Sequence, residues 1–458
     1  MNRPLLTLAT LLTLAITQAS HAQAPTPRLD PPVRDKLLPP IGPVTGTMKT
    51  LDQIEPRIPA NDLPGDTEWS IIIDEPGSYY LTGNVKGVWG KGGIYISARD
   101  VTLDLNGFVV DGANVGERET GIYAWGERSF ILNGSVTNWP GVALATRDHA
   151  TISRIHASTQ YENDWPGAGI ATGAFANVKD CRVTRSHGVG FNIGVGSVVE
   201  NCIASECDSD GFRATVSSLG AVVNATRITN STAYQCEEYG FKASHSSVFT
   251  GCVSIQNQTA GFVVYAAGIL ANCSSLNDRT GYDLGLNSTA TNCVAFASYD
   301  DAFVCEWGVK LYQCSVVSSQ KNGFVLNGHP FYENNQCIEC TAISCNGAGF
   351  LIDLSKSTLI GCQSTNNAIA IEIASTATGS IIDSCIISDN ESGIQCDADS
   401  SVIRNNTLDS LTVTGVNNLI INNTIAGGAK AVTIAPGNKD AAIVNHPDDA
   451  GPLSNIAL

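Results

Sequence analysis

The chain has 458 residues, and its 26 Lys and Arg against 43 Asp and Glu give a formal net charge of −17. This balance excludes a nucleic-acid-binding protein, whose affinity comes largely from basic side chains that neutralise phosphates. A hydrophobic content of 43% is enough for a large core and argues against global disorder. Length alone predicts about three domains of ~150 residues each.

The first 22 residues have the pattern of a secretory signal peptide. Arg3 supplies a positive charge, residues 5–16 form a short apolar run, and Ser20 and Ala22 place small residues before a cut at Gln23. We therefore expect a secreted, periplasmic or cell-surface protein, with the signal peptide cleaved near Ala22. The apolar run is too short to cross a membrane and no later stretch reaches ~18 apolar residues, so no membrane span is predicted.

A Pro-rich stretch at residues 23–47 predicts an extended tether. The sequence Thr50-Leu51-Asp52-Gln53 is typical of a capping box, and it predicts a short helix that Pro56 ends. We expect this helix to be an amino-terminal cap on the structure that begins near residue 48.

A repeat of about 21 residues organises the rest of the chain. It is visible as pairs of a small residue and an aromatic residue: Gly190-Phe191, Gly211-Phe212, Gly240-Phe241, Gly261-Phe262, Gly281-Tyr282, Ala302-Phe303, Gly323-Phe324 and Gly349-Phe350. A fixed period of this size indicates a solenoid, which replaces the estimate of three domains from length.

Each repeat is predicted to be one coil of a parallel β-helix. Segments such as Val101–Leu105 and Leu419–Ile421 are short and rich in β-branched residues, and Gly and Asn separate them. Three strands of three to five residues plus their turns fill about 21 residues. The predicted fold is all-β: a single domain over residues 48–458, with about 15 coils and a carboxy-terminal tail from about residue 446.

Strand alternation predicts which side chains face the core. The repeated aromatic residues point inward as a stack, and nine cysteines form a second inward column: Cys181, Cys202, Cys252, Cys273, Cys293, Cys314, Cys340, Cys362 and Cys385. We expect buried free thiols here, because in-register side chains of parallel strands do not favour the disulfide dihedral angle. Cys207 and Cys236 are the best candidates for a disulfide, since they occupy matching positions on adjacent coils of an exported protein.

The repeat, together with Gly77–Val85 and the following Val101–Phe108, resembles secreted bacterial right-handed parallel β-helix proteins of the pectate-lyase-like superfamily. The resemblance covers roughly residues 48–445. It implies the fold but not the reaction, because the superfamily includes polysaccharide lyases, polygalacturonase-like hydrolases, epimerases, and binding or adhesion proteins. It also implies an elongated polysaccharide that lies along one face of the rod.

Two sets of family motifs can be sought in the sequence. Asp300-Asp301 can be the D-D of polygalacturonase-like hydrolases, but Gly328-His329-Pro330 matches their G-H-G only in part, and no N-x-D or R-x-K lies at the required places. The Lys and Arg motifs of alginate and chondroitin lyases are not evident either. These departures weigh against hydrolase membership.

Outward positions beside the first strand of each coil supply the candidate site. Aromatic side chains expected to stack on sugars are Tyr95, Tyr123, Trp125, Trp139, Trp165 and Tyr265. Candidate catalytic residues are Arg213, Lys242, Asp283, Asp300 and Asp301, because a cation beside carboxylates suits proton abstraction next to a uronate carboxylate. Candidate Ca²⁺ ligands are Asp208, Asp210, Glu237 and Glu238, since this hard cation prefers oxygen. The alternative for all these charges is an ordinary solvated turn or surface ion pair.

The leading hypothesis is an exported protein that interacts with polysaccharide, with possible lyase activity on uronate-containing glycans around Arg213 and Lys242. A non-catalytic rod for adhesion or carbohydrate binding is the first alternative. Glycoside hydrolysis by the paired carboxylates is the second.

Overall fold

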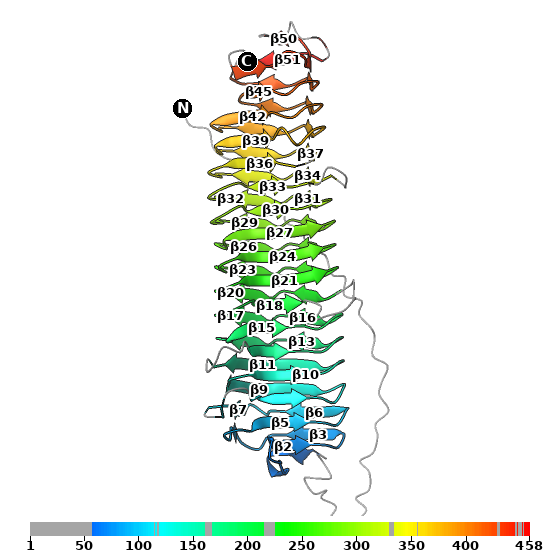
Figure 1. The fold of residues 1–458 in the computed structure, drawn as a ribbon, viewed down its shortest axis with the longest axis vertical. Coiled ribbons are helices and arrows are strands. Elements are labelled where there is room, and N and C mark those ends of the chain that lie inside the picture. The colour runs from blue at the N-terminus through cyan, green and yellow to red at the C-terminus, as the bar shows by residue number, and fades with distance from the viewer. Residues whose placement is uncertain are drawn as a thin grey trace, which may run out of the picture. The chain divides into compact units, whose positions relative to one another are not determined.

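Most coils of the described residues turn through three short parallel strands, and each coil stacks on the one before it (Figure 1). The computed structural model describes residues 57–458 except 114, 117–118, 161–166, 215–224, 329–333, 355, 428–430, 445–446, 448–450 and 452. The predicted signal peptide, tether and cap helix therefore lie outside the described residues. Residues 55–458 form one compact unit, as the single-domain prediction requires.

Within the described residues the first sheet contains seventeen parallel strands, against about 15 coils expected from the aromatic repeat. The strands are β2 (Trp69–Ile73), β5 (Gly92–Ile96), β8 (Ile122–Ala124), β10 (Val142–Thr146), β12 (Gly167–Ala171), β15 (Gly188–Asn192), β18 (Phe212–Ala214), β21 (Tyr239–His245), β24 (Ala260–Ala266), β27 (Thr280–Leu286), β30 (Phe303–Cys305), β33 (Phe324–Leu326), β36 (Ala348–Ile352), β39 (Ile369–Ile373), β42 (Ser392–Cys396), β45 (Leu411–Val413) and β48 (Val432–Ile434).

The second sheet follows in each coil. Its strands are β1 (Ile58–Pro59), β3 (Gly77–Tyr80), β6 (Val101–Asp104), β13 (Asn177–Lys179), β16 (Val198–Glu200), β19 (Arg227–Thr229), β22 (Val248–Thr250), β25 (Ile269–Ala271), β28 (Thr289–Thr291), β31 (Lys310–Tyr312), β34 (Gln336–Ile338), β37 (Thr358–Ile360), β40 (Ile381–Asp383), β43 (Val402–Arg404), β46 (Leu419–Ile421) and β49 (Lys439–Asp440). Two longer strands, β9 (Phe130–Trp139) and β11 (Thr151–Thr159), run through both the second and the third sheet and join them into one.

The third sheet completes each coil. Its strands are β4 (Val85–Lys86), β7 (Val109–Asp111), β14 (Arg182–Thr184), β17 (Ile203–Ser205), β20 (Thr232–Tyr234), β23 (Val253–Ile255), β26 (Ser274–Leu276), β29 (Val294–Phe296), β32 (Ser315–Val317), β35 (Thr341–Ile343), β38 (Gln363–Thr365), β41 (Ile386–Ser388), β44 (Thr407–Leu408), β47 (Thr424–Ile425), β50 (Ile443–Val444) and β51 (Asn455–Ala457). β51 pairs with β47, so the end of the expected tail adds a strand to this sheet. The described residues include a 3-10 turn, η1 (Ala60–Asp62), and no described helix is long and apolar enough to cross a membrane.

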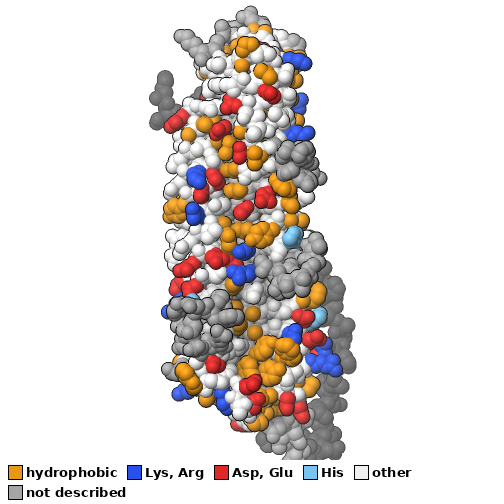
Figure 2. Space-filling view, in the orientation of Figure 1, with side chains coloured by type: hydrophobic (Ala, Val, Ile, Leu, Met, Phe, Trp, Pro, Cys, Tyr) orange, Lys and Arg blue, Asp and Glu red, His pale blue; other side chains and the backbone are white. Residues whose placement is uncertain are grey.

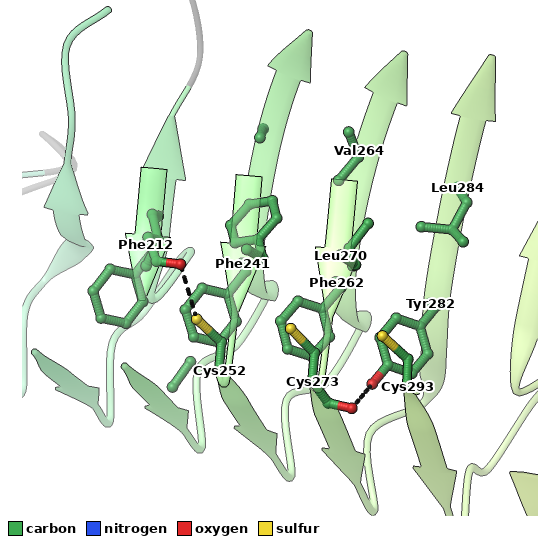
Figure 3. Close-up of a cluster of buried hydrophobic side chains, with 14 of the residues drawn as sticks. Phe212, Phe241, Cys252, Phe262, Val264, Leu270, Cys273, Tyr282, Leu284 and Cys293 are labelled. Atoms are coloured by element: carbon green, nitrogen blue, oxygen red, sulfur yellow. Dashed lines mark hydrogen bonds between the residues drawn. The ribbon is translucent and has the colours of Figure 1, made fainter. Parts of the chain in front are cut away.

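The aromatic stack fills the core behind the first sheet, as predicted. The rings from Phe191 to Phe350 stack on one another with centroid separations of 4.3–5.0 Å. Tyr282 replaces a phenylalanine in this stack, and its buried hydroxyl donates a hydrogen bond to the Cys273 carbonyl at 2.7 Å (Figure 3). A stack of fully buried rings in register fixes the alternation of every first-sheet strand, because a slip of one residue would turn the rings into solvent.

All fifteen cysteines are buried and free. The predicted column of nine thiols is present, and Figure 3 shows three of them, Cys252, Cys273 and Cys293, side by side. The predicted Cys207–Cys236 disulfide is wrong: both residues are free thiols facing the core, 0% exposed. Beyond Cys385 asparagines occupy the same column, and their side chains accept hydrogen bonds from the backbone of the preceding coil.

Candidate functional site

The outward side of the first sheet carries one continuous row of in-register side chains, which we call the outer row. Its members are Tyr95, Tyr123, Ala145, Ala171, Asn192, Arg213, Lys242, Val263 and Asp283. The row changes from aromatic to small, then to basic, and then to acidic along the axis. Since stacked strands are about 4.8 Å apart, the four steps from Tyr123 to Arg213 span about 19 Å.

An aromatic cluster covers the amino-terminal end of the outer row. Trp69 stacks on Tyr95 with centroids 5.2 Å apart, Tyr95 lies 5.9 Å from Tyr123, and Tyr123 meets the edge of Trp125 at 5.8 Å. The guanidinium carbon of Arg147 lies 3.5 Å from the Trp125 ring centroid. The four rings line a hollow of about 430 Å³, and Figure 2 shows hydrophobic side chains gathered over the amino-terminal coils.

A second hollow, which we call the central groove, lies around Arg213 and has a volume of about 460 Å³. Its floor is made of small residues of β12, among them Gly167 and Ala171, so the sheet surface is low there. Its polar lining is His187, Asn192, Asp208, Ser209, Arg213 and Glu238. Small residues therefore separate the aromatic cluster from a group of charges.

Arg213 is anchored from beneath by a buried carboxylate. Its Nε donates to Asp210 Oδ2 at 2.5 Å, its Nη2 donates to Ser209 Oγ at 2.9 Å, and Nη2 lies 3.8 Å from Glu238. The Asp210 side chain is 0% exposed, and its Oδ1 has no hydrogen-bond partner among the described residues. Burial raises the pKa of Asp210 above 3.8, and the ion pair with Arg213 opposes this rise. Nη1 of Arg213 makes no hydrogen bond within the described residues, so one donor end stays available.

Lys242 follows Arg213 in the outer row. Its ammonium lies 4.3 Å from the centroid of the Tyr239 ring, and no carboxylate of the described residues lies within ion-pair distance of it. Two steps further, burial raises the pKa of Asp283, with repulsion from Glu306 as the second cause. Tyr265, on the strand between them, is 50% exposed. The outer row thus presents two adjacent cations, and a carboxyl group follows two strands further along.

His187 and Asp208 form a hydrogen-bonded pair at the side of the central groove. Nδ1 of His187 lies 2.6 Å from Asp208 Oδ2, and both residues line the groove with Arg213. A carboxylate on one ring nitrogen fixes the orientation and tautomer of an imidazole. The pair therefore has the arrangement of an oriented base.

Asp300 and Asp301 lie elsewhere, on the turns between the third and first sheets. Asp300 makes ion pairs with Lys321 and, at 3.8 Å, with Arg279, and it lines a separate hollow that does not include Arg213. Asp301 accepts hydrogen bonds from the backbone and side-chain amides of Asn322 in the next coil. The structure does not bring these two carboxylates together with Arg213, Lys242 and Asp283.

Comparison with known proteins agrees with this architecture. The family described as "Right handed beta helix region" matches residues 120–279. The chain is a right-handed parallel β-helix protein. None of the curated proteins matches its sequence.

Solved structures similar to this β-helix protein have low sequence identity to it and TM-scores below 0.5. The A-module of a mannuronan C-5 epimerase from Azotobacter vinelandii has 12% identity over 71% of this chain and 90% of that chain, with a TM-score of 0.38. Tailspike protein 3 of bacteriophage CBA120 has 9% identity over 88% of this chain and 65% of that chain, with a TM-score of 0.39. A rhamnogalacturonan lyase has 14% identity over 63% and 72%, with a TM-score of 0.29.

One predicted site residue, Trp139, has a different place in the β-helix from the one expected. Trp139 is a core residue and not a sugar platform: it is 0% exposed, and its Nε1 donates to the Val110 carbonyl at 3.0 Å. Gly112 and Gly121 leave the space that its ring fills, since a Cβ atom at either would meet the ring within 3 Å. Trp165 lies outside the described residues.

The predicted Ca²⁺ site is not supported by the coordinates. Among the described residues of the β-helix no group of three or more His, Cys, Asp or Glu side chains is arranged to hold a metal ion. Asp210 is turned toward Arg213 and Asp208 toward His187, so these carboxylates already have partners. Sequence reasoning also missed Trp69 and the His187–Asp208 pair. The 21-residue spacing of that pair, one coil, was the available signal.

Proposed function

We propose that this protein binds an anionic polysaccharide along the outer row and cleaves it by β-elimination in the central groove. The observation that carries the proposal is the register of the first sheet, which places an aromatic cluster, a low floor and two cations on one straight line. A rigid extended polymer needs matched contacts at intervals along such a line.

The aromatic cluster suits the apolar faces of sugar rings. Trp125 is 47% exposed, and Tyr95 and Tyr123 are half-buried by their neighbours, so their positions are set before a ligand arrives. Preorganised aromatic side chains contribute contact area at a low cost in conformational entropy. The span of about 19 Å to Arg213 means that only an extended chain can reach both ends.

The protein has a net charge of −17, yet we propose that it prefers an acidic polymer, because the two cations of the outer row make the local surface positive. Arg213 presents Nη1 to the groove while Asp210 and Ser209 hold its other nitrogens. Lys242 carries a charge without a carboxylate partner among the described residues. Together they would neutralise a uronate carboxylate, which lowers the cost of removing the proton at C5.

His187 supplies the base in this proposal, because Asp208 orients it beside Arg213. The imidazole takes the C5 proton, the electron pair forms the C4=C5 double bond, and the C4–O4 bond breaks. The departing oxygen takes a proton from solvent. Arg213 itself is held by a buried carboxylate, so its role is charge neutralisation and not proton abstraction.

A panel of uronate polymers tests the proposal by the ultraviolet absorbance of the new double bond. The wild-type protein should generate this absorbance on at least one polymer, and His187→Gln should remove it while leaving binding intact. His156→Gln is the matched control, because His156 lies on β11 away from the groove. Absence of the chromophore on every polymer, or equal activity of His187→Gln, would refute the elimination step.

Binding without cleavage is the second candidate. Arg213 already contacts Asp210, Ser209 and Glu238, and Asp208 is paired with His187. These contacts fix the charged surface in place, which favours a protein that binds the polymer without cleaving it. In that case the same polymer binds with the same dependence on Tyr123 and Lys242, and no absorbance appears.

A further inference from the structure

We infer that the hollow around Tyr299 is a second saccharide-binding site, for a sugar unit that carries a carboxylate. This hollow, which we call the turn pocket, has a volume of about 530 Å³ and lies on three successive coils. It is lined by Gln256, Asn257, Gln258, Asn277, Arg279, Tyr299 and Asp300. None of these residues lines the central groove, so the inference stands apart from the proposed function.

Amide side chains with unused hydrogen-bonding capacity converge on the turn pocket. Within the described part of the chain, the side chains of Gln258 and Asn277 make no hydrogen bond. Gln256 uses only its oxygen, which accepts from Gln235 at 3.1 Å. Amides offer both donors and acceptors, which is the pattern that vicinal sugar hydroxyls require.

Tyr299 provides the apolar wall of the pocket. Its side chain is 57% exposed, and it is among the most exposed large hydrophobic residues of the described chain. An aromatic ring held at the edge of a pocket with convergent polar groups is a platform for one face of a sugar ring. A ring this exposed on a solvated turn contributes little to the packing of the solenoid core.

Arg279 sets the chemical class of the ligand. Its side chain is 65% exposed, and its contact with Asp300 is 3.8 Å from Nε, beyond hydrogen-bond distance. Lys321 pairs with the same carboxylate, so Asp300 is neutralised without using the Arg279 donors. The guanidinium fork is therefore open to a planar carboxylate, which it binds with two parallel hydrogen bonds.

Buried groups fix the shape of this pocket. Asn257 donates from its backbone and side-chain nitrogens to Asp278 Oδ1 at 2.7 and 2.9 Å, and Asp278 Oδ2 accepts from Ser275 at 2.6 Å. Asp278 and Asn257 precede Arg279 and Gln258 in the chain, so a rigid buried network holds the turns that present the unpaired groups. Preorganisation of this kind reduces the entropic cost of binding.

Calorimetric titration with a galacturonate trisaccharide tests the inference, with the neutral galactose trisaccharide as comparison. The titration is done in the Asp210→Asn/Arg213→Gln background, which disables the central groove, so binding there cannot mask the result. We expect the acidic trisaccharide to bind about tenfold more tightly than the neutral one, and Arg279→Gln to remove that difference. Tyr299→Ala should abolish binding of both sugars, and Tyr299→Phe should keep it.

Arg227→Gln is the matched control, because Arg227 is an exposed arginine of the second sheet. Unchanged affinity in Arg279→Gln and Tyr299→Ala, or an equal loss in Arg227→Gln, would overturn the inference. Failure of the proposed function would be seen differently, as absence of polymer binding along the outer row while the trisaccharide still binds the turn pocket.

Discussion

Replacement of Arg213 by glutamine should destabilise the fold as well as alter the groove. The change leaves the buried Asp210 carboxylate without its cation, and Oδ1 of that carboxylate already has no partner among the described residues. Removal of one member of a buried ion pair costs about 3–5 kcal/mol, and because the Arg213 side chain is 30% exposed we expect about 3 kcal/mol. Lys242→Gln is the control, since Lys242 has no carboxylate partner, and it should cost no more than about 0.5 kcal/mol.

The cost should depend on pH in a defined direction. Burial already raises the pKa of Asp210 above 3.8, and loss of Arg213 raises it further. A raised carboxyl pKa in the folded state contributes stability that is present below the unfolded-state pKa and is lost as pH rises through the folded-state pKa. The penalty of Arg213→Gln should therefore be present at neutral pH, should shrink as pH falls through the raised folded-state pKa of Asp210, and should be absent below 3.8.

Urea unfolding at several pH values measures this penalty, provided that the m-values of the variants agree. Asp210→Asn/Arg213→Gln removes both charges and should recover most of the loss at neutral pH. A cost below about 1 kcal/mol for Arg213→Gln, or a cost that does not change with pH, would refute the buried pair as the anchor of the groove. The activity of a single Arg213 variant should therefore be compared with the activity of this double variant as well as with that of the wild type.

Three other outcomes follow from the core. Asp278→Asn should stabilise the protein by about 1–3 kcal/mol at neutral pH and should have no such effect below pH 3.8. Burial raises the pKa of Asp278, whereas a neutral amide at this position keeps the hydrogen bonds to Asn257 and Ser275. Lower stability of the variant at neutral pH would contradict this. Trp139→Ala should cost about 3–5 kcal/mol in thermal or urea unfolding, whereas Trp89→Ala, 74% exposed, should be nearly neutral; similar costs would place Trp139 at the surface. Thiol titration should find fifteen reactive groups after unfolding and none in the native protein, and two fewer would indicate a Cys207–Cys236 bridge.

The solenoid and its core could be predicted because they repeat. A small residue followed by an aromatic at one-coil spacing fixes both the strand and its inward face, and the buried rings of Phe212 and Phe241 stack as that rule requires. The same alternation placed Arg213, Lys242 and Asp283 on one outward line. Local steric rules suffice for these features, because every coil obeys the same ones.

The errors arose where a coil departs from the repeat. Trp139 ends β9, a ten-residue strand that passes through two sheets, and it follows Asn138, whose positive φ of 59° turns the chain so that the expected outward side chain points inward. Nothing in the sequence near Trp139 marks that change. Gly112, one of the glycines that make room for its ring, comes from the preceding coil, and only folding brings the two residues together.

The charged residues were the hardest to assign, because their partners decide their roles. Asp208 and Asp210 look alike in sequence, yet the first faces His187 and the second is buried under Arg213. Asp300 and Asp301 suggested a catalytic pair, and each instead bonds to a neighbouring coil. Side-chain direction at a turn depends on the coils above and below, which a single repeat unit does not contain.

The most direct test of the account is the affinity of a uronate oligosaccharide long enough to reach from Tyr123 to Lys242, measured for a variant of each of these outer-row residues and for one variant on another sheet. Tyr123→Ala and Lys242→Gln should each weaken binding, while Tyr234→Ala on the third sheet should leave it unchanged. Tyr123 and Lys242 are five strand steps apart, about 24 Å, and an oligosaccharide shorter than this span should lose its dependence on one of the two residues. Binding that is unaffected by both outer-row variants, or that falls equally in Tyr234→Ala, would contradict the account.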